Sequence, residues 1–112
     1  MTKLITIPTK QNLSNIVEYS DAILIGIDNL SVNVPDTYSI HEVEEIIKKY
    51  NQIEVFVALN KNMHKCDLDN LKDALIKLDK MNIAGIFYYD IAVLEYRNTL
   101  NLKVPLVWSQ EH

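Results

Sequence analysis

Val55-Phe56-Val57-Ala58-Leu59 is a run of apolar residues without polar alternation, and a similar run lies on each side of it. These runs are Ala22-Ile23-Leu24-Ile25 and Ile83-Ala84-Gly85-Ile86-Phe87-Tyr88. Runs of this kind are typical of strands buried on both faces, as in a parallel sheet. Leu4-Ile5-Thr6-Ile7 and Val104-Pro105-Leu106-Val107-Trp108 are weaker strand candidates, and the tryptophan of the second is expected in the core. The sequence therefore predicts five strands.

Helical patterns separate the predicted strands. Ser39-Ile40-His41-Glu42 is a capping box, in which the serine hydroxyl and the glutamate carboxylate each accept a hydrogen bond from an otherwise unpaired backbone N–H. Apolar residues then recur at helical spacing, at Ile40, Val43, Ile46, Ile47 and Tyr50. This pattern predicts a helix over 40–50.

Three further helices are expected, and aspartates open two of them. Asp67 is expected to cap a helix that buries Leu68, Leu71, Leu75 and Leu78. Asp90 is expected to cap a shorter helix with Ile91 and Leu94 pointing inward. The first helix of the chain has only a short apolar stripe, formed by Leu13, Ile16 and Val17.

The resulting order, β-α-β-α-β-α-β-α-β, predicts an α/β fold, because helices supply the crossovers that parallel strands need. The turn after the first strand, Pro8-Thr9-Lys10-Gln11-Asn12, has no glycine, which disfavours a nucleotide-binding doubly wound sheet. No closing helix follows the last predicted strand. We therefore expect a partial, half TIM-type barrel, with residues 1–112 as a single domain and the N-terminal portion of a longer barrel.

Composition restricts the class of protein. The chain has 112 residues, of which 48% are hydrophobic and 23% charged, as in an ordinary globular domain. It lacks both a membrane-spanning run and a signal peptide, and the single cysteine, Cys66, fits a reducing compartment, so we expect a cytoplasmic protein. The net charge of −4 makes nucleic-acid binding by this piece unfavourable. No cofactor is expected, since one cysteine cannot hold an iron–sulfur cluster.

Several stretches resemble the collagenase-like peptidase family, peptidase family U32, in its variant from low-GC Gram-positive bacteria. They are Asp21-Ala22-Ile23-Leu24-Ile25-Gly26, Leu30-Ser31-Val32, the helix start at 38–45, Val57-Ala58-Leu59-Asn60-Lys61-Asn62-Met63-His64, Gly85-Ile86-Phe87-Tyr88-Tyr89-Asp90 and Pro105-Leu106-Val107-Trp108-Ser109-Gln110-Glu111-His112. The resemblance implies a hydrolase of the peptidase class, bacterial and uncharacterised in mechanism, whose barrel continues past His112. Related branches act in RNA and quinone hydroxylation with iron–sulfur cysteines in their second half. The first loop, Pro8-Thr9-Lys10-Gln11, departs from the family's small-residue loop, which puts close backbone approach there in doubt.

Sites in barrels form at the carboxyl ends of the strands. That rule selects the polar residues Lys10, Asp28, Asn29, Ser31, Asn60, His64, Asp90, Gln110, Glu111 and His112. Among these we expect catalytic roles for Asp90, Glu111 and His112, since carboxylates and imidazole serve acid–base chemistry. The alternatives are a helix cap for Asp90 and a frayed chain end for the other two, which as neighbours on a strand would point to opposite faces.

Substrate contacts are expected from Lys10, Asn60, His64 and Gln110. A solvated loop residue is the alternative for His64, and no metal is expected, because a His-x-Cys pair with Cys66 falls short of the usual three or four ligands. Ser31 lacks the Gly-x-Ser-x-Gly elbow of a serine nucleophile.

Two functions follow from these observations. In the first, the chain is part of a peptidase-like barrel that acts on peptides, and its active site is incomplete in this chain alone. In the second, it is a non-catalytic α/β binding or self-associating module, either an open sheet or two half barrels that meet as a homodimer through exposed sheet edges.

Overall fold

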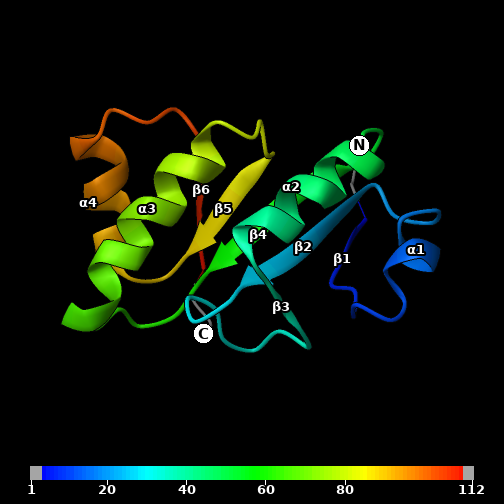
Figure 1. Cartoon of the computed structure of the whole chain (residues 1–112), viewed down its shortest axis with the longest axis horizontal. Helices are drawn as coiled ribbons and strands as arrows, with labels where there is room; N and C mark the ends of the chain where they lie inside the picture. The colour runs from blue at the N-terminus through cyan, green and yellow to red at the C-terminus, as the bar shows by residue number, and fades with distance from the viewer. Residues whose placement is uncertain (1–3, 110–112) are drawn as a thin grey trace.

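A computed structural model describes residues 4–109 and shows one parallel sheet with helical crossovers (Figure 1). The strands are β1 (Ile5–Thr6), β2 (Ala22–Ile27), β3 (Thr37–Tyr38), β4 (Glu54–Leu59), β5 (Gly85–Tyr88) and β6 (Leu106–Trp108). Their order is β1-β2-β4-β5-β6, and every pairing is parallel. The sheet and its helices are consistent with a partial TIM-type barrel, which confirms the predicted fold class.

A helix lies between successive strands except between β2 and β3, which a loop joins. They are α1 (Leu13–Ile16), α2 (Ile40–Lys49), a 3₁₀ turn η1 (Lys65–Asp67), α3 (Leu68–Asp79) and α4 (Ile91–Thr99). In Figure 1, α2 and α3 lie in front of the sheet. Within residues 4–109, no helix has the length and apolar character needed to cross a membrane.

Strand β3 was not predicted. It pairs with the carboxyl end of β2, Thr37 with Gly26 and Tyr38 with Ile27, whereas β1 pairs with the first two residues of β2. Threonine and tyrosine both favour strands. Two residues are too short for a periodic pattern, so only the contact with β2 identifies this strand.

The capping box of α2 is confirmed. The hydroxyl of Ser39 accepts a hydrogen bond from the N–H of Glu42 at 3.1 Å, and the carboxylate of Glu42 accepts one from the N–H of Ser39 at 2.9 Å. Val43 and Ile46 are buried against the sheet. This helix forms as predicted because its start is fixed locally.

The predicted cap of α3 is wrong in its geometry. Asp67 has helical backbone angles and makes no side-chain cap to α3. Its carboxylate instead accepts a hydrogen bond from the N–H of His64 at 2.8 Å, because residues 65–67 form the turn η1 before the helix. The predicted stripe is otherwise present: Leu71, Leu75 and Leu78 are buried.

Helix α4 has its predicted cap but a different buried face. The carboxylate of Asp90 accepts a hydrogen bond from the N–H of Ala92 at 2.9 Å, which confirms the cap. Ile91, expected inward, is 59% exposed, whereas Val93 is fully buried. The inward face of α4 is therefore set by Val93, with Ala92 and Tyr96 packed beside it.

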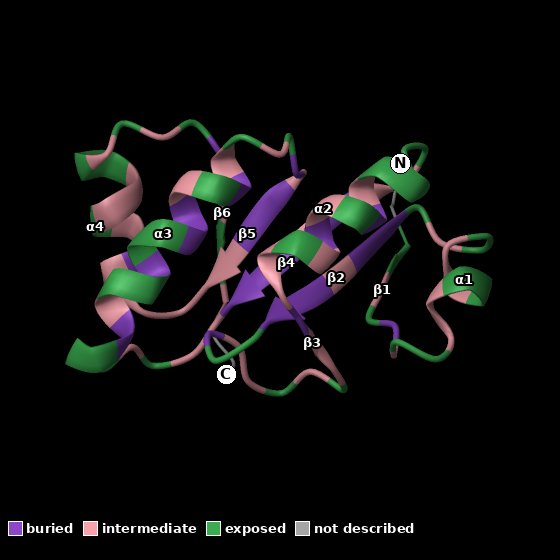
Figure 2. Cartoon of the chain, viewed as in Figure 1, coloured by how far each residue is buried: buried purple, intermediate pink, exposed green. Residues whose placement is uncertain are grey.

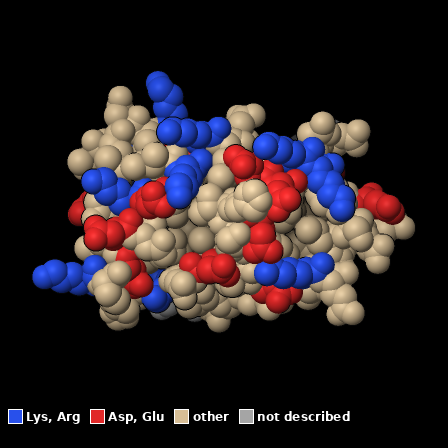
Figure 3. All heavy atoms as spheres, viewed as in Figure 1, with Lys and Arg blue, Asp and Glu red and all other residues tan. Residues whose placement is uncertain are grey.

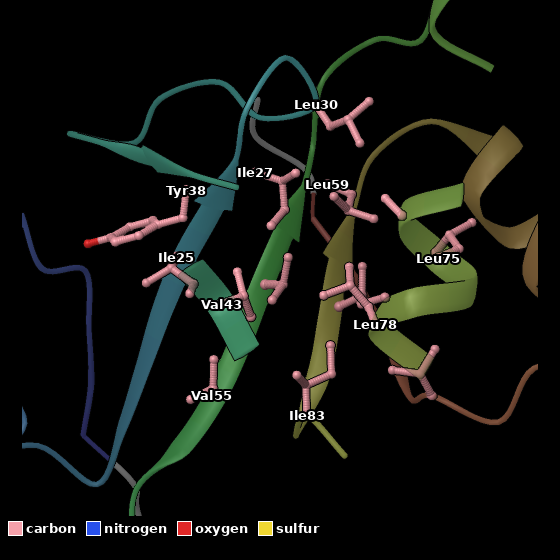
Figure 4. Close-up of a cluster of buried hydrophobic side chains, with 14 of the residues drawn as sticks. Ile25, Ile27, Leu30, Tyr38, Val43, Val55, Leu59, Leu75, Leu78 and Ile83 are labelled. Carbon is pink, nitrogen blue, oxygen red and sulfur yellow. The ribbon is translucent and has the colours of Figure 1, made fainter. Parts of the chain in front are cut away.

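One hydrophobic core lies between the sheet and its helices (Figure 2). Ile25, Val57 and Ile86 pair in register across β2, β4 and β5, and all three are buried in it. Figure 4 shows the core side chains of β2 and β4 facing those of α3, including Leu75 and Leu78.

The opposite face of the sheet carries a second apolar row. Leu24 pairs in register with Phe56, and the rings of Phe56 and Phe87 meet edge to face with centroids 5.6 Å apart. All three side chains are half-buried and lie outside the core cluster. Alternate residues of a strand point to opposite faces, so these side chains occupy the face that a complete barrel encloses.

Trp108 does not lie in the core. It is 58% exposed, at the end of β6, where it pairs with Tyr88. Strand β6 pairs only with β5 within the described residues, so its outer edge has no neighbour there to cover the indole. The expectation that Trp108 is buried is wrong for this reason.

Candidate functional site at the carboxyl rim of the sheet

Because all strands run parallel, their carboxyl ends meet at one edge of the sheet. We call the loops at this edge the carboxyl rim: residues 7–12, 28–36, 60–67, 89–90 and 109. Polar side chains in these loops form a series of hydrogen bonds that connect each loop to the next.

Ser31 joins the ends of β2 and β4. Its hydroxyl accepts a hydrogen bond from the N–H of Ile27 at 2.7 Å and donates one to the carbonyl of Ala58. The loop can lie this close because β2 has Gly26 at this point: a Cβ there would meet Val34 Cγ2 at 2.7 Å and Ser31 Cβ at 2.9 Å. Because its hydroxyl both accepts from β2 and donates to β4, Ser31 links the ends of these two strands.

Asn60 joins the loop after β4 to the loop after β2. Its Oδ1 accepts a hydrogen bond from the N–H of Val32 at 2.9 Å, and its Nδ2 donates one to the carbonyl of Val32 at 3.0 Å. The amide thus acts as a two-point clamp on a backbone 28 residues away in sequence.

Asp90 joins the end of β5 to the loop after β4. Its Oδ1 accepts a hydrogen bond from the N–H of Ala92 in α4, and its Oδ2 accepts one from the N–H of Met63 at 2.7 Å. A carboxylate has about four acceptor positions, so two hydrogen bonds leave room for a third partner. Asp90 is therefore both a helix cap and a rim carboxylate held in a fixed orientation.

Lys61 and Asp67 form an ion pair under the same loop. The ammonium of Lys61 lies 3.0 Å from Asp67 Oδ1 and donates to the carbonyl of Asn29 at 3.3 Å. The N–H of His64 and the ammonium of Lys61 stabilise the carboxylate, which lowers the pKa of Asp67. This pair fixes the backbone around His64, whose side chain is exposed at the rim.

Sequence reasoning missed Lys61 and the role of Asp67. The sequence did contain a local signal for the role of Asp67. This residue stands three positions after His64, at the spacing of a capping box, and Lys61 lies three positions before His64.

Lys10 lies apart from Asn60, His64 and Asp90. Its N–H donates to Asp36 Oδ2 at 2.7 Å, and its ammonium lies 3.5 Å from Glu42 Oε2 and 5.1 Å from the ring centre of Tyr38. The side chain thus turns over the start of α2, on the helical side of the sheet. Asn60 and His64 thus lie in the loop after β4, to which Asp90 is hydrogen-bonded through Met63, whereas the side chain of Lys10 turns away.

The remaining predicted residues, Gln110, Glu111 and His112, lie outside the described residues. The chain reaches them from Ser109, whose N–H donates to the carbonyl of Tyr88 at 2.7 Å, next to Asp90.

Acidic and basic side chains are interspersed over the helical face (Figure 3). Across residues 4–109, no group of three or more His, Cys, Asp or Glu side chains is placed to hold a metal ion. Cys66 is exposed and free.

A parallel sheet with helical crossovers, an apolar inner face and a polar carboxyl rim defines a domain of the α/β-barrel class. The family model of Peptidase family U32 matches residues 9–112, and the chain therefore belongs to this family. No match is found among curated proteins or among solved structures.

Proposed function

We propose that this chain contributes one part of a peptidase active site, located at the carboxyl rim. Two observations support the proposal: membership of Peptidase family U32, and the carboxylate of Asp90, which is fixed after β5 by hydrogen bonds from Ala92 and from Met63 in the loop that also carries Asn60 and His64. In this proposal the substrate is a peptide, and the protein acts in the cytoplasm without a bound cofactor.

The proposed acid–base groups are Asp90, Glu111 and His112. Two backbone N–H groups hold Asp90 in place. Imidazole exchanges protons near neutral pH, so His112 would complement a carboxylate in acid–base chemistry. Asp90 would orient or deprotonate the attacking group, and His112 would return a proton to the leaving amine.

The proposed substrate contacts are Asn60, His64, Gln110 and Lys10. Asn60 would act together with the backbone of Val32 that it clamps, and His64 would reach the substrate from the loop fixed by Lys61 and Asp67. Lys10 would take part only by turning away from Glu42, 3.5 Å from its ammonium.

We further propose that the active site needs strands beyond those of this chain. Strands β1 and β6 are the two ends of the described sheet and do not pair with each other, so the sheet is open. A TIM-type barrel closes with eight strands and draws its catalytic groups from several of them.

Hydrolysis of a fluorogenic gelatin-type peptide tests this proposal. The chain would be assayed alone and when continued through eight strands with the second half of a complete family member. We expect cleavage by the eight-stranded form and little or none by the chain alone. Equal, substantial rates from both forms would contradict incompleteness, and no cleavage by either would contradict peptidase function.

A second candidate function is self-association as a non-catalytic module. The observation that favours it is the exposure of apolar side chains at both edges of the sheet: Ile5 and Ile7 at β1, and Val107 and Trp108 at β6. Two copies related by a two-fold axis could place β1 of each beside β6 of the other, which would cover both edges.

A further inference from the structure

A cavity of about 310 Å³ lies on the helical side of the molecule, between α1 and α2. Leu13 and Ile46 supply apolar walls, and the rings of Tyr38 and Tyr50 line it as well. Ligand sites usually measure about 300–1,000 Å³, so this cavity suits a small molecule. Asn60, His64 and Asp90 do not line it; of the residues proposed for the active site, only Lys10 does.

The hydroxyl of Tyr38 is a buried polar group without a partner. The residue is only 3% exposed, and its hydroxyl has no hydrogen-bond partner within residues 4–109. Figure 4 shows the hydroxyl pointing away from the core side chains. A buried hydroxyl left unpaired is costly, which is why such groups in proteins almost always have a partner.

The Tyr38 hydroxyl is protonated and can donate a hydrogen bond. Burial, with the nearby carboxylates of Asp36 and Glu42, raises the pKa of Tyr38. The phenol therefore keeps its proton at neutral pH, and the partner it favours is an acceptor such as a carboxylate oxygen.

The charged groups around the cavity balance each other. The lining contains two lysines, Lys10 and Lys49, and two glutamates, Glu42 and Glu45, so its formal charges cancel. Each lysine also lies over an aromatic ring, Lys10 over Tyr38 at 5.1 Å and Lys49 over Tyr50 at 5.4 Å. A simple anion would meet two carboxylates and a simple cation two ammonium groups, whereas a zwitterion meets a partner for each of its charges.

We propose that this cavity binds a small zwitterion with an apolar side chain, of the class of the free aliphatic α-amino acids. The ligand carboxylate accepts hydrogen bonds from the Tyr38 hydroxyl and from Lys10. The ligand ammonium faces Glu42 and Glu45, and the apolar side chain contacts Leu13 and Ile46. Lys10 is the movable cover: its half-exposed ammonium leaves Glu42 for the ligand carboxylate and so opens the way to the hydroxyl.

Titration of the ¹⁵N-labelled full chain with L-leucine, followed by NMR, tests the proposal. We expect saturable shifts of the backbone amides of Leu13, Tyr38 and Ile46. Tyr38→Phe, which removes only the hydroxyl, should weaken binding about tenfold or more, as expected for a lost hydrogen bond to a charged group. The matched control is Tyr96→Phe in α4, away from the cavity, which should bind like the wild type.

Two analogues test the requirement for both charges. N-acetyl-leucine lacks the ammonium and leucine amide lacks the carboxylate, and both should bind more weakly than leucine. The proposal is overturned if leucine shifts none of these amides up to its solubility limit, which is the result expected if water alone pairs with the hydroxyl. It is also overturned if N-acetyl-leucine binds as well as leucine.

Folding of the variant does not limit the test. Tyr38→Phe removes a hydroxyl that has no partner in the described chain, so its free energy of unfolding should equal or exceed that of the wild type. If the variant nevertheless fails to fold, Lys10→Ala at the exposed cover should give the same loss of leucine binding. Unchanged leucine binding by Lys10→Ala would contradict the proposed carboxylate contact.

Discussion

Asp67 and Asp90 each stand directly before an apolar helical run, and their sequence contexts predict the same role for both. Asp90 adopts extended angles, φ −81° and ψ 134°, and caps α4. Asp67 adopts helical angles, φ −87° and ψ −17°, and its carboxylate turns back to His64. The difference arises from Lys65 and Cys66, which add a 3₁₀ turn before the helix, and residue type alone does not indicate that turn.

The lowered pKa of Asp67 implies that the stability of the fold depends on pH. Its pKa is lowered by the N–H of His64 first and by Lys61 second. A carboxyl group whose folded pKa lies below its unfolded value, about 3.9, stabilises the fold above that value and loses this contribution as pH falls through the folded pKa. We therefore expect the free energy of unfolding to fall as the pH drops below about 4.

Asp67→Asn should reduce this acid-induced loss, because the asparagine cannot be protonated in that range. Urea unfolding of the wild type and the variant at neutral and acidic pH measures the difference. Asp69→Asn, at an exposed position in the first turn of α3, is the control and should keep the wild-type pH dependence. An Asp67→Asn variant with an unchanged pH profile would show that the ion pair contributes nothing.

At the scale of elements, a pattern predicts a helix or strand well when it is long or when its ends are fixed locally. The capping box placed the start of α2 at Ser39, and the long apolar runs located β2, β4 and β5. The face of α4 was misjudged because Ile91, Val93 and Leu94 are all apolar. Which of them is buried depends on the neighbouring α3, and this contact is not encoded in the periodicity of α4.

The orientation of α4 can be tested with two truncations. Val93→Ala removes two buried methyl groups and should lower the free energy of unfolding by about 2 kcal/mol. Ile91→Ala removes more carbon from a side chain that is 59% exposed, and should change it by about 0.5 kcal/mol or less. Chemical denaturation measures both changes. A larger loss of stability in Ile91→Ala than in Val93→Ala would instead support the prediction that Ile91 points inward.

At the scale of the whole molecule, strand order and direction could be predicted, whereas the contacts of the rim could not. Alternating strands and helices imply parallel strands, and parallel strands imply a shared carboxyl rim. The contacts within the rim join loops far apart in sequence, as Asp90 joins Met63 over 27 residues and Asn60 joins Val32 over 28. No local pattern indicates such pairs, so the list of rim residues was predictable but their partners were not.

The open edges of the sheet predict self-association of the isolated chain. Sedimentation at increasing concentration should show a dimer, since exposed apolar edges favour association. Ile5→Lys places a charge at the β1 edge and should weaken the dimer. Ile91→Lys, at another exposed apolar residue, on α4, is the control and should not. A wild-type chain that stays monomeric, or equal effects of both substitutions, would contradict association through the edges.

The central claim is that catalysis occurs at the carboxyl rim and depends on the carboxylate of Asp90. Its control is Asp79, whose Oδ1 likewise accepts two backbone N–H groups, from Lys103 and Val104, both at 2.8 Å, but just before β6, at the other end of the sheet. Asparagine removes the charge in each case. At Asp79 the remaining Oδ1 can keep both acceptor roles, whereas at Asp90 the amide nitrogen replaces one carboxylate oxygen, so one of the two backbone hydrogen bonds, to Ala92 or to Met63, is also lost.

The most direct measurement is therefore the rate of peptide hydrolysis by Asp90→Asn and Asp79→Asn variants of the eight-stranded form. We expect kcat to fall about 10²- to 10⁴-fold in Asp90→Asn, as for loss of a general acid or base, and to stay within about twofold of wild type in Asp79→Asn. A folded Asp90→Asn variant with the wild-type rate would contradict the account.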